Sequence, residues 1–352
     1  MSSTKNEATP LVDASIHTSA TEKTSLGCST QMALIISLVS LISIVVVKVQ
    51  LTAYLFSMAS FPTAYSFYSS IVTDVLLIPM FLIFPSQWGV PSLDMFLGPK
   101  YTFTLIIIFT TCDMAFTNIA LANISITLQQ CIAATNPFWT ILIETLLHGK
   151  CQHPIIYGVV SGLVVGAIFV SISDMKHVNV TGIIFACMAV LCSACKYAFT
   201  HAAFRQYKDK LGALSLLFWV DLLMIPIFIP WCLINGELVK MFQANMDFAT
   251  WMQFTGTAAL GGVRALTQFF VLSYTTATSM SIANTFALVL NILISMMWQS
   301  HTINAMLVIG IIIVIGTSAL YAHLKSSKDA CFGILRSKEP PKSEKTEPLA
   351  RA

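Results

Sequence analysis

Sixty consecutive residues, from Ala265 to Leu324, contain no Asp, Glu, Lys or Arg. Only lipid or a deep protein interior favours a stretch of this length without a charge. The rest of the 352-residue chain is similar, because 10% of all residues are charged and 56% are hydrophobic. A soluble domain usually carries about 25% charged residues. The sequence therefore predicts a polytopic membrane protein that has the lipid bilayer as its main partner.

Ten segments are long and apolar enough to cross a bilayer, since a helical span needs about 20 mainly apolar residues. The runs are too long for barrel strands, so we expect an all-α bundle of ten transmembrane helices. The expected spans are 32–54, 64–84, 101–121, 126–147, 154–173, 181–203, 213–234, 251–272, 278–298 and 303–324. We expect the polar tails, 1–31 and the basic 325–352, to be disordered.

Lysine and arginine are enriched in cytoplasmic loops. If the N-terminus is cytoplasmic, the cytoplasmic loops hold Lys100, Lys150, Arg205, Lys208 and Lys210, and the opposite loops hold only Lys176 and Lys240. This distribution predicts that both termini are cytoplasmic and that Asn179, a glycosylation candidate, is lumenal. We recognise no cleavable signal or transit peptide at the N-terminus. We therefore expect the endomembrane system, with Golgi or ER favoured and the vacuolar membrane left open.

The composition argues against several other classes of function. A net charge of +3 without a basic stripe argues against nucleic-acid binding. The sequence has no catalytic constellation, no phosphate-binding Gly-rich loop and no metal-ligand spacing, so we expect no enzyme, cofactor or metal site. The Cys192 and Cys195 pair lies in a span without an accompanying His, which favours packing. A homodimer is left open.

The chain repeats itself. Residues 131–168, shifted by 148, match 279–316 without a gap, and the pairs include Asn136 with Asn284 and Gly162 with Gly310. The units expected are 32–174 and 181–324, each with five helices, and an odd number of helices forces opposite orientations. Inverted repeats are typical of alternating-access carriers, which bind substrate near the midplane. Gly158, Gly162 and Gly166 recur every fourth residue, which indicates a ridge for helix packing.

Several stretches resemble the triose-phosphate and nucleotide-sugar transporter branch of the drug/metabolite transporter superfamily. The resemblance spans most of 32–324 and depends on the order and spacing of moderately specific motifs. The stretches are KVQLTAYLFSMASFPTAYSF from Lys48, FTNIALANISITLQQCIAATNPFWTILIETLLHGK from Phe116, YKDKLGALSLLFWVDLLMIPIFIP from Tyr207 and ATSMSIANTFALVLNILIS from Ala277. It implies ten helices in two inverted units and exchange of a sugar phosphate or nucleotide sugar for phosphate or a nucleoside monophosphate.

This chain departs from the resemblance at the residues that grip phosphate. Plastid members carry a Lys-Arg pair in the ninth helix, where this chain has Ala287 and Leu288, and a Lys in the fourth helix, where it has Ala133. The departure weakens the case for triose-phosphate exchange and leaves a nucleotide sugar as the leading substrate class. An exporter of amino acids, peptides or drug-like cations is the alternative, with Asp74, Asp113 and Asp221 then lining the cavity. A non-transporting scaffold or receptor is a third possibility.

Charged residues inside spans are costly, and they normally face a cavity or pair with one another. The seven are Lys48, Asp74, Asp113, Glu144, Lys196, Asp221 and Arg264. Lys196 and Arg264 lie deepest among the basic ones and are candidates to bind an anion, with pairing to an aspartate as the alternative. Lys48 is a further candidate, whereas we expect Glu144 and Asp221 to be structural.

Polar side chains in the same spans complete the predicted site for a small-molecule substrate. Amides and hydroxyls in a bilayer either line a cavity or join helices. Tyr197 could stack on a base or sugar, and Gln268 shares a helix face with Arg264. The predicted substrate-binding residues are Lys196, Arg264, Lys48, Asn284, Asn136, Gln130, Thr127, Gln268 and Tyr197, with Gln129 as a further cavity candidate.

Overall fold

The computed structural model describes residues 28–336, with gaps at 86–87, 93–94, 97–100, 149–153, 174–178, 208–211, 245 and 295–304 and at several positions between 276 and 292. Within these residues the regular elements are helices and no strand occurs. Five of the described helices are long and apolar enough to cross a membrane, within Ile36–Met58, Pro62–Ile83, Thr102–Asn123, Val180–Tyr207 and Ala213–Ile234. The prediction of an all-α membrane protein is therefore confirmed.

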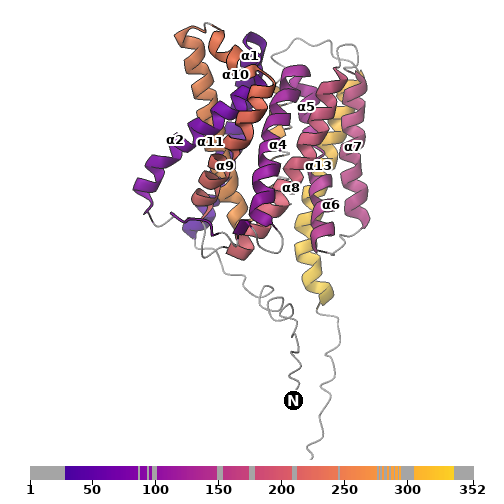
Figure 1. The fold of residues 1–352 in the computed structure, drawn as a ribbon. Helices are drawn as coiled ribbons and strands as arrows, with labels where there is room; N and C mark the ends of the chain where they lie inside the picture. Colours follow the sequence, from indigo (N-terminus) through magenta and orange to yellow (C-terminus); the bar gives the residue numbers. More distant parts are fainter. Residues whose placement is uncertain are drawn as a thin grey trace, which may run out of the picture.

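The helices form two neighbouring groups (Figure 1). The first contains α1, α2, α9, α10 and α11, and the second contains α4 to α8 and α13. Helix α4 joins the groups, because it packs against α8 and also against α2 and α9. The bounds are α1 Cys28–Met58, α2 Pro62–Ile83, α4 Thr102–Asn123, α5 Ile126–Ala133, α6 Asn136–His148, α7 Pro154–Ser173, α8 Val180–Tyr207, α9 Ala213–Ile234, α10 Glu237–Gln243, α11 Phe248–Tyr274 and α13 Ala305–Arg336.

The described helices follow the hydropathy pattern closely. The predicted spans 154–173 and 213–234 coincide with α7 and α9. Proline supports two helix starts, at Pro62 of α2 and Pro154 of α7, where its missing N–H would have no partner in any case. The predicted span 278–298 lies largely outside the described residues.

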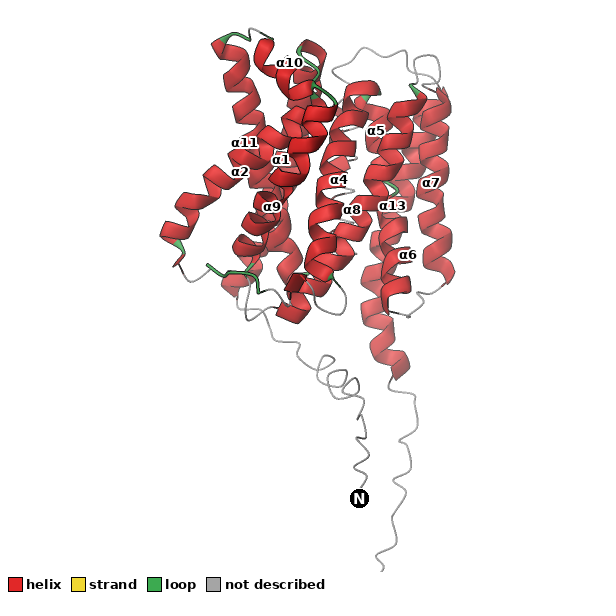
Figure 2. Cartoon of the chain, viewed as in Figure 1, coloured by secondary structure: helices red, strands yellow, loops and turns green. Residues whose placement is uncertain are grey.

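The predicted single helix 126–147 is interrupted, and the structure has α5 and α6 in its place (Figure 2). Pro137 explains the break, because proline has no N–H for the carbonyl of residue 133 and its ring clashes with that carbonyl. Short-range bonds close the gap instead, from Thr135 N to Ile132 O at 3.1 Å and from Phe138 N to Thr135 O at 2.9 Å. The chain therefore has a helix interruption in the middle of an apolar segment.

Two further differences lie at helix ends. The short helix α10 lies in the connection before the predicted span 251–272. The Glu237 carboxylate of α10 accepts the backbone N–H groups of Thr63 and Ala64 at 2.7 and 3.1 Å, so it caps the start of α2. At the other end of the chain, α13 continues to Arg336, beyond the expected end at Leu324.

The α7–α13 contact uses the predicted glycine ridge. A Cβ built on Gly162 would lie 2.6 Å from Thr317 Cγ2, and one on Gly166 would lie 2.7 Å from Val314 Cγ2 and 3.1 Å from the Gly310 carbonyl oxygen. The two helices can therefore approach closely only because these positions lack a side chain. Gly158 has open space around it and takes no part in the contact.

Candidate functional site

A polar cavity lies at the centre of the molecule, with about 1170 Å³ of empty space, part of it open to solvent. Its lining comes from α1, α2, α4, α5, α6, α8, α9 and α11 and from Asn284 and Leu288. The charged lining residues are Lys48, Asp113, Lys196, Asp221 and Arg264. A bilayer protein keeps such groups away from lipid, so a charged interior cavity of this kind is typical of a solute site.

Seven of the nine predicted substrate-binding residues line this cavity, namely Lys48, Gln130, Asn136, Lys196, Arg264, Gln268 and Asn284. Thr127 and Tyr197 are buried but do not line it. The Tyr197 hydroxyl instead bonds to the side-chain amide of Gln268. Tyr197 therefore supports a lining residue from behind and is not placed to stack on a substrate.

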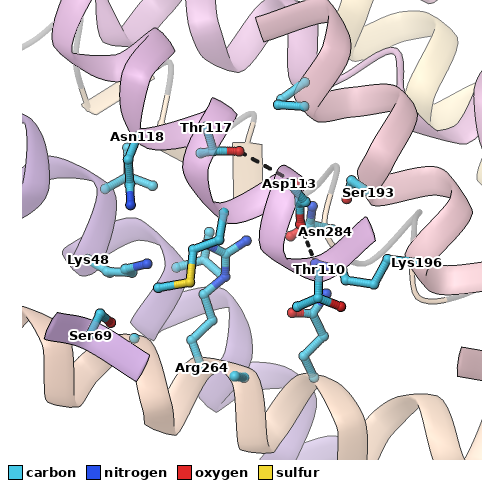
Figure 3. Close-up of a pocket in the computed structure, with 18 of the residues that line it drawn as sticks. Lys48, Ser69, Thr110, Asp113, Thr117, Asn118, Ser193, Lys196, Arg264 and Asn284 are labelled. Carbon is cyan, nitrogen blue, oxygen red and sulfur yellow. Dashed lines mark hydrogen bonds and ion pairs between the residues drawn. The ribbon is translucent and has the colours of Figure 1, made fainter. Parts of the chain in front are cut away.

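Lys196 forms an ion pair with Asp113 across the contact between α8 and α4 (Figure 3). Both side chains are largely buried, with 11% and 16% of their surface exposed. Thr117 Oγ1 donates to Asp113 Oδ1 at 3.5 Å, and the Lys196 ammonium lies 5.1 Å from the Tyr197 ring centroid. The positive charge of Lys196 is therefore already balanced within the protein.

Lys48 and Arg264 are in a different situation. Figure 3 shows both side chains reaching into the same space, Lys48 from α1 and Arg264 from α11. Among the residues that the structure describes, neither has an ion pair or a side-chain hydrogen bond. A Cβ built on Gly261 would lie 3.3 Å from Lys48 Cε. Gly261 therefore lets Lys48 lie against α11, on the helix face that Arg264 shares three residues later.

Amides and hydroxyls of the cavity are held by contacts between helices. Asn136 Nδ2 donates to Ser193 Oγ at 3.0 Å, and Thr140 Oγ1 donates to Asn136 Oδ1 at 2.9 Å. Asn118 Nδ2 donates to Ser66 Oγ at 2.7 Å. These bonds fix the directions in which the amides face the cavity, so the lining is ordered before any solute arrives.

The sequence analysis missed part of the lining. It treated Asp221 as structural, but Asp221 lines the cavity from α9. Ser69 and Thr73 of α2 also line it, and their four-residue spacing places them on one helix face. That spacing of small polar residues in an apolar span was the available signal. The remaining acids of the spans, Asp74 and Glu144, do not line the cavity.

Two departures from the family's anion grip can now be placed. Ala133 and Leu288, which stand where plastid members carry a Lys and the second residue of the Lys-Arg pair, both line the cavity. Ala287 is fully buried. The positions expected to hold phosphate thus lie at the same cavity but are apolar here, and its basic residues come from other positions.

Asn179, the glycosylation candidate, lies outside the cavity. It is exposed immediately before α8, and its side-chain amide donates to Asn123 Oδ1 at 3.0 Å. Its own Oδ1 accepts from Thr181 N at 3.0 Å. Glycosylation of this residue stays a prediction.

Comparison with known proteins places the chain in a family. The model of the Triose-phosphate Transporter family matches residues 38–322. A comparison with curated proteins found no match. One solved structure, described only as "Crystal structure of protein", is 13% identical, with 83% of this chain and 98% of the other covered and a TM-score of 0.58. That likeness concerns the fold alone. The family match covers most of the sequence, and the chain therefore belongs to the Triose-phosphate Transporter family, a group of membrane transporters within the drug/metabolite transporter superfamily.

Proposed function

We propose that the protein exchanges a small organic anion, a nucleotide sugar or a sugar phosphate, across an endomembrane by alternating access. One observation carries the proposal: Lys48 and Arg264 reach into a central cavity without an acidic partner among the described residues. An unpaired charge inside a membrane protein is costly. A bound anion offsets that cost, so the cavity favours a negatively charged solute.

A nucleotide sugar is the substrate class that the lining favours. The diphosphate of a nucleotide sugar carries two negative charges, and Lys48 and Arg264 supply two positive charges that no described acid pairs with. Arg264 can hold a phosphate oxygen pair with two parallel bonds, and Lys48 acts as a point charge. The surrounding amides and hydroxyls suit sugar and base. The apolar Ala133 and Leu288 argue against the phosphate grip of the plastid exchangers.

Helix packing supports alternating access through two inverted units. In the proposed repeat α1, α2, α4 and α7 correspond to α8, α9, α11 and α13. Observed contacts then come in matched sets: α2 with α9 and α7 with α13 join equivalent helices, and α1 with α11 mirrors α4 with α8. The interruption between α5 and α6 lies at the cavity, as in carriers with discontinuous helices. We infer that one unit rocks against the other around a fixed site.

The cation-exporter alternative receives less support. It needs Asp74, Asp113 and Asp221 to line the cavity together, but Asp74 is not part of the lining and Asp113 is bound to Lys196. For the membrane orientation we propose that both termini are cytoplasmic. Helix α1 begins and α13 ends on the same side of the molecule (Figure 1), which an even number of spans requires. The Golgi or ER membrane is the proposed location.

Counterflow in liposomes tests the proposal. The purified full chain is reconstituted, the liposomes are preloaded with one nucleoside monophosphate at a time, and uptake of labelled nucleotide sugars is measured. We expect uptake that depends on the internal nucleotide and that falls strongly in Lys48→Ala and Arg264→Ala. Lys240→Ala is the matched control, because Lys240 is an exposed lysine on α10, away from the cavity. Folded protein without counterflow for any pair, or unchanged uptake in both cavity variants, contradicts the proposal.

A further inference from the structure

Asp74 of α2 is a buried acid that the proposed binding site does not use. Only 6% of the residue is exposed, and neither Oδ1 nor Oδ2 has a hydrogen-bond partner among the described residues. Burying an ionised carboxylate without a partner is very costly. A bound proton removes that cost. Asp74 is therefore built to hold a proton for at least part of the time.

Asp221 lies on α9, a helix that packs against α2. The Glu237 carboxylate, just beyond the end of α9, bonds to the first N–H groups of α2, so the two packed helices are antiparallel there. At about 1.5 Å per residue, Asp74 lies roughly 18 Å from the start of α2, and Asp221 roughly 20 Å from the end of α9. The charge of Asp74 acts on Asp221.

The remaining charged groups leave these two acids without an ion-pair partner. The helices packed against α2 are α4, α9, α10 and α11. Their charged residues are Asp113, Asp221, Glu237, Lys240 and Arg264. The other titratable residues on these helices and on α2 are Cys112, Cys232, Tyr274, Tyr65 and Tyr68. Asp113 is bound to Lys196, and Glu237 and Lys240 lie at the far end of α2. No described residue forms a hydrogen bond or an ion pair with the Asp221 carboxyl group.

We propose that Asp74 and Asp221 form a proton site coupled to the cavity, which takes up one proton when an anion binds and releases it when the anion leaves. The inference rests on the proposed anion transport. Asp221 lines the cavity with Lys48 and Arg264, and the charge of Lys48 acts on it. A bound anion engages those cations and repels Asp221. Asp74 lies in the buried surroundings behind Asp221, where an ionised carboxylate has no partner among the described residues. Asp74 and Asp221 are therefore not ionised at the same time.

The proton step is simple and balanced. When the anion enters, a proton from cavity water forms an O–H bond with an Asp221 carboxylate oxygen, and the water is left as hydroxide that bulk solvent neutralises. When the anion leaves, that O–H bond breaks and the proton returns to water. Linkage is reciprocal, so proton uptake on anion binding requires that the anion binds more tightly at lower pH.

Equilibrium binding tests the site with the nucleotide sugar that gives the highest counterflow. In the wild type we expect uptake of about one proton per bound anion, measured with a pH dye in weak buffer. Over the range where the pair titrates, we expect the dissociation constant to rise about tenfold per pH unit. Asp221→Asn mimics the protonated acid. It should abolish both effects and bind at high pH as tightly as the wild type binds at low pH.

Two further variants sharpen the test. Asp74→Asn keeps a neutral group at the buried position, so proton uptake should persist at Asp221 with little change in the pH at which affinity falls. Asp247→Asn is the matched control, because Asp247 is an exposed acid at the start of α11, and it should behave as the wild type. Absence of proton uptake in a wild type that binds the anion overturns the proposal, and so does pH-dependent binding that survives Asp221→Asn. If the wild type shows no counterflow at any pH, the transport proposal itself fails, and the proton site fails with it.

Discussion

Two walls of the cavity present basic side chains in opposite situations. On the α1–α11 wall, formed by Lys48, Gly261 and Arg264, both cations lack an acidic partner among the described residues. On the α4–α8 wall, formed by Asp113, Ser193 and Lys196, the cation is bound to an acid on the neighbouring helix. A basic residue in a span is therefore not by itself a binding group. A basic residue that pairs with an acid on a neighbouring helix holds the helices together, whereas one without such a partner is available to bind a solute.

The largest expected effect concerns the paired wall. Lys196→Gln leaves the buried Asp113 carboxylate with Thr117 as its one hydrogen-bond partner among the described residues, and breaking a buried pair costs about 3–5 kcal/mol of unfolding free energy. Because replacing both members removes the stranded charge, Asp113→Asn combined with Lys196→Gln should recover most of that loss. Thermal unfolding in detergent measures both. A double variant no more stable than the single one would show that the pair is not the source of the stability.

The next effect concerns the unpaired wall. Arg264→Gln removes a charge-assisted bidentate contact, and we expect the KM for the anion to rise about 10- to 100-fold, or about 1.4–2.7 kcal/mol, with the fold intact. The double variant Asp113→Asn with Lys196→Gln should stay within a few-fold of wild type, since its pair has no net charge to lose. Initial rates of counterflow measure the two. Equal KM changes would erase the difference between the walls.

The sequence predicts those features of the fold that have a local physical cause. Bilayer thickness sets the length of a span, so the hydropathy pattern gave α7 and α9 to the residue. The interruption before α6 also has a local cause at Pro137, although the apolar run around it favoured one continuous helix. The helical continuation of α13 beyond Leu324 shows that a polar composition does not exclude a helix.

The site was predictable in kind but not in detail. The free-energy cost of a charge in lipid identifies Lys48, Lys196 and Arg264 as residues that need a partner or a cavity. Which of them is paired depends on a contact between positions 113 and 196, and no local pattern encodes a contact over that separation. The position of Asp221 on the lining depends in the same way on how α9 packs against α2.

A third prediction concerns the α7–α13 contact, which we expect to affect stability but not substrate binding. Gly166→Val places a side chain against Val314 and the Gly310 carbonyl, and overpacking of this kind costs about 1–3 kcal/mol. Gly158→Val is the matched control on the same helix, because open space surrounds that position. We expect a lower unfolding temperature only for Gly166→Val, with KM near wild type in the protein that remains folded. A large change in KM would mean that this contact shapes the cavity as well.

The smallest expected effect on stability concerns the start of α2. This is the helix that contributes Ser69 and Thr73 to the cavity. Glu237→Gln replaces the carboxylate that accepts from Thr63 and Ala64 by a neutral amide. The amide oxygen can still accept, so only the interaction of the negative charge with the helix N-terminus is lost, about 0.3–1 kcal/mol. Glu237→Ala removes the acceptor too and should cost about twice as much, still without a change in KM. Thermal unfolding of the two variants beside Lys240→Ala measures this series. If both glutamate variants unfold at the same temperature as that control, the α10 contact does not stabilise the start of α2. In that case it does not stabilise the α1–α11 wall either.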